Sequence, residues 1–130
     1  MAWDAYISGN LMAPLDQEGT TLTSAAILGH DGGVWAQSEK FPVISDAETA
    51  QLLAAMADSS ITSVNITGVK YMKLSADDKV LRCRKDKVGF IARKTLTAIV
   101  VGFYTDPQVS GQTCNKIVEA MGDYLEDSGY

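Results

Sequence analysis

Apolar residues recur at helical spacing near the C-terminus of this 130-residue chain. The five that define the pattern lie at positions i, i+3, i+4, i+7 and i+11, which form one face of an α-helix. They are Cys114, Ile117, Val118, Met121 and Leu125. The pattern predicts a helix over residues 113–127, with Thr113 as its N-cap and Gly129 as its stop.

Two further helices are expected nearer the N-terminus. Apolar residues at spacings of three and four predict a helix over residues 3–13. Pro14 ends this helix, because proline lacks a backbone donor and clashes with the preceding turn. Ser45 and Glu48 have the spacing of a capping box, in which each side chain bonds the backbone N–H of the other residue. They predict the start of a helix that runs to about Asp58.

Between the predicted helices, the pattern changes to short apolar or alternating runs that are typical of β-strands. Two strands are expected over 24–29 and 34–37, joined by a tight turn at Asp31-Gly32-Gly33. The remaining candidates all follow residue 60, and they are 62–66, 69–75, 80–85, 88–94 and 97–104. Their connections are so short that they can join only antiparallel neighbours.

The order of these elements predicts the fold class. Helix, two strands, helix, five strands and helix together indicate an α/β (α+β) fold with a central antiparallel sheet. We expect the N- and C-terminal helices to pack together on one face and the remaining helix to cover the other. No repeat, low-complexity tract or linker interrupts the pattern, so residues 1–130 are expected to form a single domain.

Composition agrees with an ordinary globular protein, at 46% hydrophobic and 21% charged residues. The N-terminus has neither a basic region nor a long apolar run, so no signal peptide is expected. The longest apolar run, over 98–102, is far too short to span a bilayer. We expect a cytoplasmic protein in which Cys83 and Cys114 are reduced, with Cys114 buried on its helix.

Charge is unevenly distributed along the chain, whose net charge is −5. Residues 79–94 hold seven of the eleven basic residues and one acid, a local charge of +6. The acidic remainder argues against a nucleic-acid-binding protein. The basic stretch is suited to an acidic partner surface or an anionic lipid, although a solvated strand face would also explain it.

Aromatic residues gather at the two ends of the sequence. Trp3, Tyr6, Tyr124 and Tyr130 fall within its first six or last seven positions. Both end segments are predicted to be helical, so packing the two helices together would pool these rings. A polyproline II ligand has unpaired carbonyls, and Trp and Tyr combine flat apolar surface with a hydrogen-bond donor. The pattern therefore indicates a shallow cradle for proline-rich peptides; the alternative is that the rings belong to the core.

An enzyme is the first alternative function. The only histidine, His30, stands beside a predicted turn, where an exposed residue is expected. The sequence has no Cys-x-x-Cys, no histidine pair and no glycine-rich phosphate loop, and nothing supports a Cys114–His30 dyad. We therefore expect a binding protein with no catalytic residues, no metal and no cofactor.

A sensor or interaction module of similar layered build, such as a longin- or PAS-like domain, is the second alternative. Such domains do not require Trp3, Tyr6 and Tyr124 together. A small-molecule ligand that copurified with the protein would favour this alternative.

Five segments together resemble the profilin family, especially its plant and protist forms. They are the opening Met-Ala-Trp-Asp-Ala-Tyr, residues 25–38, 68–72 and 80–85, and a last segment made of residues 111–115 and 122–125. The likeness runs from end to end, although Cys83 stands where the family usually has glycine.

The resemblance implies a monomeric, cytoplasmic, cytoskeleton-associated protein that binds actin monomers and regulates polymerisation and nucleotide exchange. It also implies binding to proline-rich proteins such as formins and to phosphoinositide headgroups. The implied poly-proline site comprises Trp3, Tyr6, Trp35, Tyr124, Leu125 and Tyr130. The implied actin site comprises Lys73, Arg82, Arg84, Lys87, Asn115 and Lys116. The implied phosphoinositide site comprises Arg82, Arg84, Lys85, Arg93 and Lys94.

Overall fold

The computed structural model describes residues 3–130, and in this part of the chain seven strands form one antiparallel sheet. The strand order is β2-β1-β7-β6-β5-β4-β3. The strands are β1 (Ser24–Gly29), β2 (Val34–Gln37), β3 (Ser63–Ile66), β4 (Val69–Ala76), β5 (Val80–Lys85), β6 (Val88–Lys94) and β7 (Ala98–Thr105). The helical elements are α1 (Asp4–Tyr6), η1 (Ile7–Leu11), α2 (Asp46–Ala57) and α3 (Gly111–Asp127).

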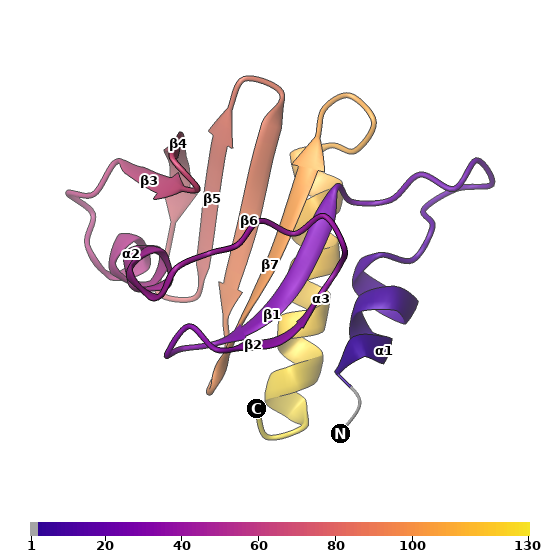
Figure 1. Ribbon diagram of the computed structural model, residues 1–130, viewed down its shortest axis with the longest axis horizontal. Coiled ribbons are helices and arrows are strands. Elements are labelled where there is room, and N and C mark those ends of the chain that lie inside the picture. Colours follow the sequence, from indigo (N-terminus) through magenta and orange to yellow (C-terminus); the bar gives the residue numbers. More distant parts are fainter. Residues whose placement is uncertain (1–2) are drawn as a thin grey trace.

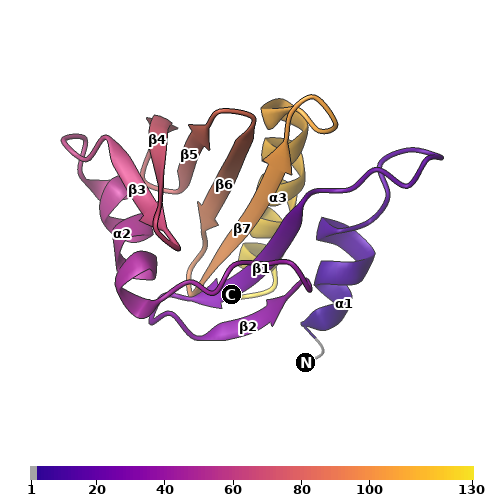
Figure 2. The ribbon, with the colours of Figure 1, turned by 45° about the horizontal axis from the view of Figure 1, so that its top comes forward.

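The predicted fold class is confirmed. The helices α1 and α3 lie side by side along one face of the sheet, and α2 packs near β3 at the other (Figures 1 and 2). All seven predicted strands are present, and their bounds differ from prediction by one residue at most. Short hairpin connections account for the antiparallel pairing of β1 with β2 and of β3 through β7. The pairing of β1 with β7 joins these two parts into one sheet.

The face beneath the terminal helices has its own apolar core. The stripe predicted on the last helix is buried there, with Cys114, Val118 and Leu125 fully enclosed. They pack against strand residues that point to this face, such as Ile27 and Val100. The amphipathic pattern of α3 is therefore what attaches it to the sheet.

The opposite face carries a second core, which α2 covers. Three rings form its centre: Phe90 lies 5.2 Å from Tyr71 and 5.3 Å from Phe103, measured between ring centroids. The capping box predicted at the start of α2 is confirmed, since the Glu48 amide donates to the Ser45 hydroxyl at 3.1 Å and the Ser45 amide to the Glu48 carboxylate at 3.0 Å.

Two details of the helices differ from prediction. Helix α3 begins at Gly111 with Ser110 as its N-cap, because the Ser110 hydroxyl accepts the amide of Thr113 at 3.1 Å; the predicted cap Thr113 is therefore inside the helix. The first helix is a single α-turn followed by a π-helical segment, in which the Met12 amide donates to the Ile7 carbonyl. Gly129 follows α3 with a φ of +93°, as a stop requires.

Both cysteines are unpaired and buried, as expected for Cys114. Burial raises the pKa of the Cys83 and Cys114 thiols to about 12. None of the helices in residues 3–130 has the length and apolar character needed to cross a bilayer.

Candidate functional site

Three aromatic rings meet where the chain enters α1 and leaves α3. The centroid of the Trp3 ring lies 4.8 Å from that of Trp35 on β2 and 4.9 Å from that of Tyr130. The rings of Trp35 and Tyr130 are 6.3 Å apart. All three side chains are half-buried, so each keeps an accessible part while the cluster holds it in place. Trp35, which only the family resemblance placed in the site, does belong to this cluster.

A pair of tyrosines extends the cluster along the terminal helices. Tyr6 is 5.6 Å from Trp3 and 5.5 Å from Tyr124, again between centroids. The two tyrosine hydroxyls approach to 3.5 Å, and this contact is the main reason why the pKa of Tyr6 is raised. Half of the Tyr124 surface is exposed to solvent. The five rings together are called the aromatic cluster below: Trp3, Tyr6, Trp35, Tyr124 and Tyr130.

An open groove continues from the tyrosine pair between η1 and α3. Its volume is about 590 Å³, and small or apolar residues line most of it. Beyond Tyr6 and Tyr124, the lining residues are Gly9, Asn10, Ala13, Ile117, Ala120 and Met121. The aromatic cluster is thus one end of a longer apolar depression.

Leu125 does not belong to this surface, which corrects the expected poly-proline site. It is fully buried in the core between α3 and the sheet. One residue along an α-helix turns the side chain by about 100°, so Tyr124 points outward where Leu125 points into the sheet. Leu125 supports the site from beneath and cannot touch a ligand.

Both arginines of the predicted actin site project from β5 on the face that α3 covers. Arg82 donates through Nε to the Asn115 side chain at 2.8 Å and lies 3.7 Å from Glu119. Arg84 pairs with Asp106 at 3.0 Å. Lys116 lies beside Arg82 along a hollow of about 410 Å³. Arg82, Arg84, Asn115 and Lys116 are therefore brought together, and we call them the basic surface.

Two exposed apolar residues beside the basic surface were not predicted. Met72 is 48% and Leu74 is 62% exposed, and Leu74 lines the same hollow as Arg82. Strand alternation produces this placement, because Met72 pairs with Arg84 and Leu74 lies two residues further along β4, on the same face. An apolar strand residue is ordinarily assigned to the core, so the period-two pattern of β4 contains no signal for this exposure.

Lys73 and Lys87 lie apart from the basic surface, so the six residues expected in the actin site do not form one cluster. Lys73 shares the face of Cys83, and its ammonium donates to the carbonyls of Ala55 at 3.1 Å and Asp58 at 3.3 Å. It thereby caps the C-terminal end of α2. Lys87 lines a separate hollow with Tyr71, in the turn between β5 and β6.

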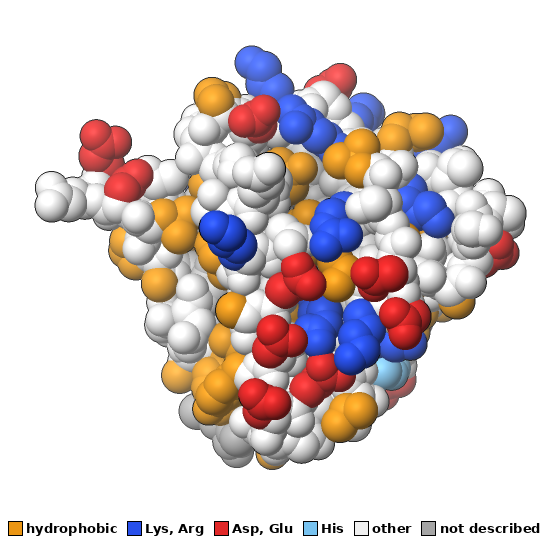
Figure 3. All heavy atoms as spheres, turned by 180° about the vertical axis from the view of Figure 1, so that it is seen from behind, with side chains coloured by type: hydrophobic (Ala, Val, Ile, Leu, Met, Phe, Trp, Pro, Cys, Tyr) orange, Lys and Arg blue, Asp and Glu red, His pale blue; other side chains and the backbone are white. Residues whose placement is uncertain are grey.

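The five cations of the expected phosphoinositide site also separate. Arg82 and Arg84 occupy the α3 face, whereas the alternation of the strands turns Lys85 and Lys94 to the other face. On the side that α3 covers, acidic and basic side chains are intermingled (Figure 3). These residues do not form one continuous cationic patch.

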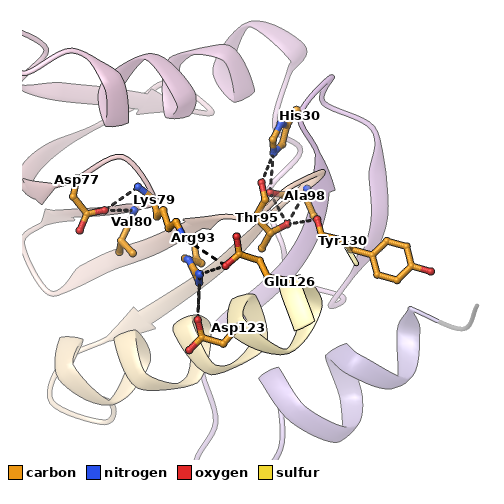
Figure 4. Close-up of polar contacts among 10 residues, drawn as sticks. All are labelled: His30, Asp77, Lys79, Val80, Arg93, Thr95, Ala98, Asp123, Glu126 and Tyr130. Atoms are coloured by element: carbon orange, nitrogen blue, oxygen red, sulfur yellow. Dashed lines mark hydrogen bonds and ion pairs between the residues drawn. The ribbon is translucent and has the colours of Figure 1, made fainter. Parts of the chain in front are cut away.

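Arg93 is buried, with only 5% of its side chain exposed. Its guanidinium lies 2.5 Å from the Glu126 carboxylate and 3.2 Å from that of Asp123, both on α3 (Figure 4). Lys79 reaches the same Glu126 oxygen at 3.7 Å. Arg93 thus attaches α3 to β6, and its charge is already neutralised within the protein.

His30 and Cys114 both form hydrogen bonds to backbone carbonyls. His30 is half-buried, and its Nε2 lies 3.1 Å from the carbonyl oxygens of both Thr95 and Ala98; Nε2 therefore carries the proton. Cys114 donates to the Gly102 carbonyl at 3.4 Å, and burial keeps its thiol protonated. In the described part of the chain, no cluster of His, Cys, Asp and Glu is arranged to hold a metal ion.

A seven-stranded antiparallel sheet carries its end helices side by side on one face, with a partly exposed aromatic cluster beside them. These features define a small α+β protein. The Profilin family model matches residues 1–130, and this chain belongs to the profilin family. Because the chain is a member of this family, it is not a longin- or PAS-like sensor module, which was the second alternative function.

Solved structures agree with this assignment. The chain is 34% identical to profilin II of Acanthamoeba castellanii, with a TM-score of 0.83 over 98% of this chain and 99% of that chain. Mouse profilin IIa in complex with a double repeat from the FH1 domain of mDia1 is 19% identical, with a TM-score of 0.77 over the whole of both chains. LokiProfilin2 in complex with rabbit actin is 17% identical, with a TM-score of 0.66 over 82% of this chain and 85% of that chain. The last two matches show a shared fold.

Proposed function

We propose that this protein binds monomeric actin through one surface and proline-rich segments of partners such as formins through another, and so regulates actin polymerisation. The observation that carries the proposal is the gathering of five aromatic rings from α1, β2 and the end of α3, in a chain that belongs to the profilin family. A mouse relative has been solved with an FH1 repeat, and another relative with actin.

The aromatic cluster is suited to a polyproline II helix. Such a ligand is stiff and has no internal hydrogen bonds, so its rings need flat apolar partners and its carbonyls need donors. Trp3 and Trp35 present indole rings with N–H donors, and Tyr124 presents a half-exposed ring with a hydroxyl. The rings hold one another in place, so little side-chain entropy would be lost on binding.

The basic surface is suited to an acidic face of actin. Arg82 and Arg84 are half-buried and already held by Asn115 and Asp106, so their guanidinium groups are oriented before contact. Partly exposed charges of this kind raise the association rate and orient docking more than they add affinity. Met72 and Leu74 add apolar anchors next to these charges.

The remaining parts of the proposal follow from family membership. We infer that the protein acts by binding rather than by catalysis, with residues 1–130 working as one domain of a monomer associated with the cytoplasmic cytoskeleton. Acceleration of nucleotide exchange on actin would require tighter binding to the open form of its nucleotide cleft than to the closed form. Arg82 and Arg84 are the candidates for contact with a phosphoinositide headgroup, and Lys85 would contribute only from the other face.

The peptide site can be tested by titrating intrinsic tryptophan fluorescence with decaproline. The chain's two tryptophans both lie in the aromatic cluster, so a saturable change would report on it directly. Trp3→Ala removes a ring that touches three others, and the loss of such an anchor is worth about 2 kcal/mol, or about 30-fold in affinity. Tyr124→Ala, at an exposed ring, tests the same site with little cost to folding.

Arg84→Glu is the matched control for the second surface. It should impair actin binding, measured by pyrene-actin polymerisation, and leave the decaproline affinity at the wild-type value. Wild-type peptide affinity in both folded aromatic variants would remove the cluster from the proposal. A joint loss of actin and peptide binding in folded Arg84→Glu protein would refute two separate surfaces.

A further inference from the structure

The main-chain oxygen of Tyr130, a residue of the aromatic cluster, accepts three hydrogen bonds. It accepts from the Thr97 amide at 2.6 Å and from the Thr97 hydroxyl at 2.9 Å. The Thr95 hydroxyl donates to the same oxygen at 2.9 Å (Figure 4). All three donors come from the turn between β6 and β7, which is distant from Tyr130 in the sequence.

The rest of Tyr130 is held on the opposite side. Its amide donates to the Leu125 carbonyl at 2.8 Å, after Gly129 has turned the chain back with a positive φ. With both main-chain groups bonded, the tyrosine ring is directed onto Trp3 at 4.9 Å and Trp35 at 6.3 Å. The turn thus determines where the third ring of the cluster lies.

The two threonines contribute differently. Thr95 is 3% exposed, and its hydroxyl also accepts a hydrogen bond from the Ala98 amide at 3.0 Å. Its carbonyl accepts a hydrogen bond from the His30 side chain. Thr95 therefore maintains the turn itself. Thr97 is exposed, and its hydroxyl is bonded to Tyr130, so it can be altered with little effect on the rest of the fold.

We propose that Thr97 is a positioning residue of the peptide site: through its hydroxyl and amide it holds Tyr130 in place, and Tyr130 completes the ring surface against Trp3 and Trp35. Thr97 need not touch the ligand. This inference rests on the proposed binding of proline-rich peptides. A ring that is held before binding loses less freedom when the peptide arrives, so releasing it weakens the complex.

Thr97→Val removes the hydroxyl, keeps the branched shape and leaves the amide donor. The loss of one hydrogen bond at an exposed site corresponds to at least about a 3-fold weaker decaproline affinity. Thr97→Ser retains the hydroxyl and should restore wild-type affinity. Thr62→Val, at an exposed threonine beside β3, is the matched control and should change nothing.

A double-mutant cycle separates positioning from direct contact. If Thr97 acts through Tyr130, Thr97→Val has no further effect on decaproline affinity in a Tyr130→Ala background. An equal loss of affinity in both backgrounds would show that Thr97 acts independently of Tyr130 and would overturn the inference. So would wild-type affinity in Thr97→Val itself.

A measurement without peptide separates this inference from the proposed function. In the peptide-free protein, nuclear Overhauser contacts between the Tyr130 and Trp3 rings should weaken in Thr97→Val and persist in Thr97→Ser. Unchanged contacts in Thr97→Val would refute positioning even if decaproline bound normally. Weakened contacts in a protein that does not bind decaproline would support positioning and refute only the peptide-binding function.

Discussion

Replacing Arg93 with methionine should remove the one buried charged side chain in residues 3–130. The guanidinium bonds Glu126 at 2.5 Å and Asp123 at 3.2 Å, and these contacts tie α3 to β6. Methionine is unbranched and flexible, so it fills much of the space left by the arginine stem. The variant therefore tests mainly the loss of charge pairing.

The expected cost follows from the exposure of the two acids. Removing one partner of a buried ion pair typically costs about 3–5 kcal/mol, because the other charge is left uncompensated. Asp123 is 71% exposed, so water takes over much of the role of Arg93 there. Glu126 is only 22% exposed, so most of the destabilisation comes from leaving its charge without a partner. We therefore expect Arg93→Met to lower the free energy of unfolding by about 3 kcal/mol, the lower end of this range.

Lys79→Met is the matched control, because Lys79 reaches the same Glu126 oxygen from an exposed position at 3.7 Å. An exposed pair is worth less than about 1 kcal/mol, and added salt should shrink its effect further. Urea unfolding followed by tryptophan fluorescence measures both free energies of unfolding. A loss in Arg93→Met no larger than that in Lys79→Met would refute a structural role for the buried pair.

Two further predictions concern protonation. Because burial raises the pKa of Cys83 and Cys114 to about 12, both thiols should resist iodoacetamide at pH 8 in native protein and react once urea unfolds it; rapid native labelling, read by mass spectrometry, would contradict their burial. Two backbone N–H donors in the turn after β4 lower the pKa of Asp77. The Asp77 carboxylate therefore stabilises the fold at pH values above the unfolded-state pKa, and this stabilisation is lost as the pH falls through the folded-state pKa. Asp77→Ala should therefore be less stable than wild type at pH 7, with the difference in unfolding free energy disappearing under acid conditions; a difference that did not vary with pH would assign the effect to packing.

Some local features depend on neighbouring residues alone, and the sequence predicted these well. The Ser45–Glu48 capping box needs only two side chains at the right spacing. The β-strands followed from runs of apolar residues and very short turns. The start of α3 was misplaced because Ser110 and Thr113 both satisfy the N-cap preference, and only the backbone conformation of Ser110 distinguishes them.

The candidate site was only partly predictable. Trp3, Tyr6 and Tyr124 could be grouped because both end segments were expected to be helical. Trp35 could not be added from spacing, since it reaches Trp3 through the position of β2 at the edge of the sheet. Tyr130 could be added, but the turn that holds it could not, because Thr97 lies 33 residues earlier.

The basic stretch shows the division most clearly. By itself, the sequence determined that positive charge gathers over residues 79–94 and that these residues form strands. Only the tertiary structure decided which of these charges lie together on one face. Strand alternation separates Lys73, which pairs with Cys83, from Arg82, and α3 supplies the two carboxylates that pair with the buried Arg93. The physical reason is that local bonding selects helices, turns and strands, whereas the exposure of a charge depends on groups brought to it from distant parts of the chain.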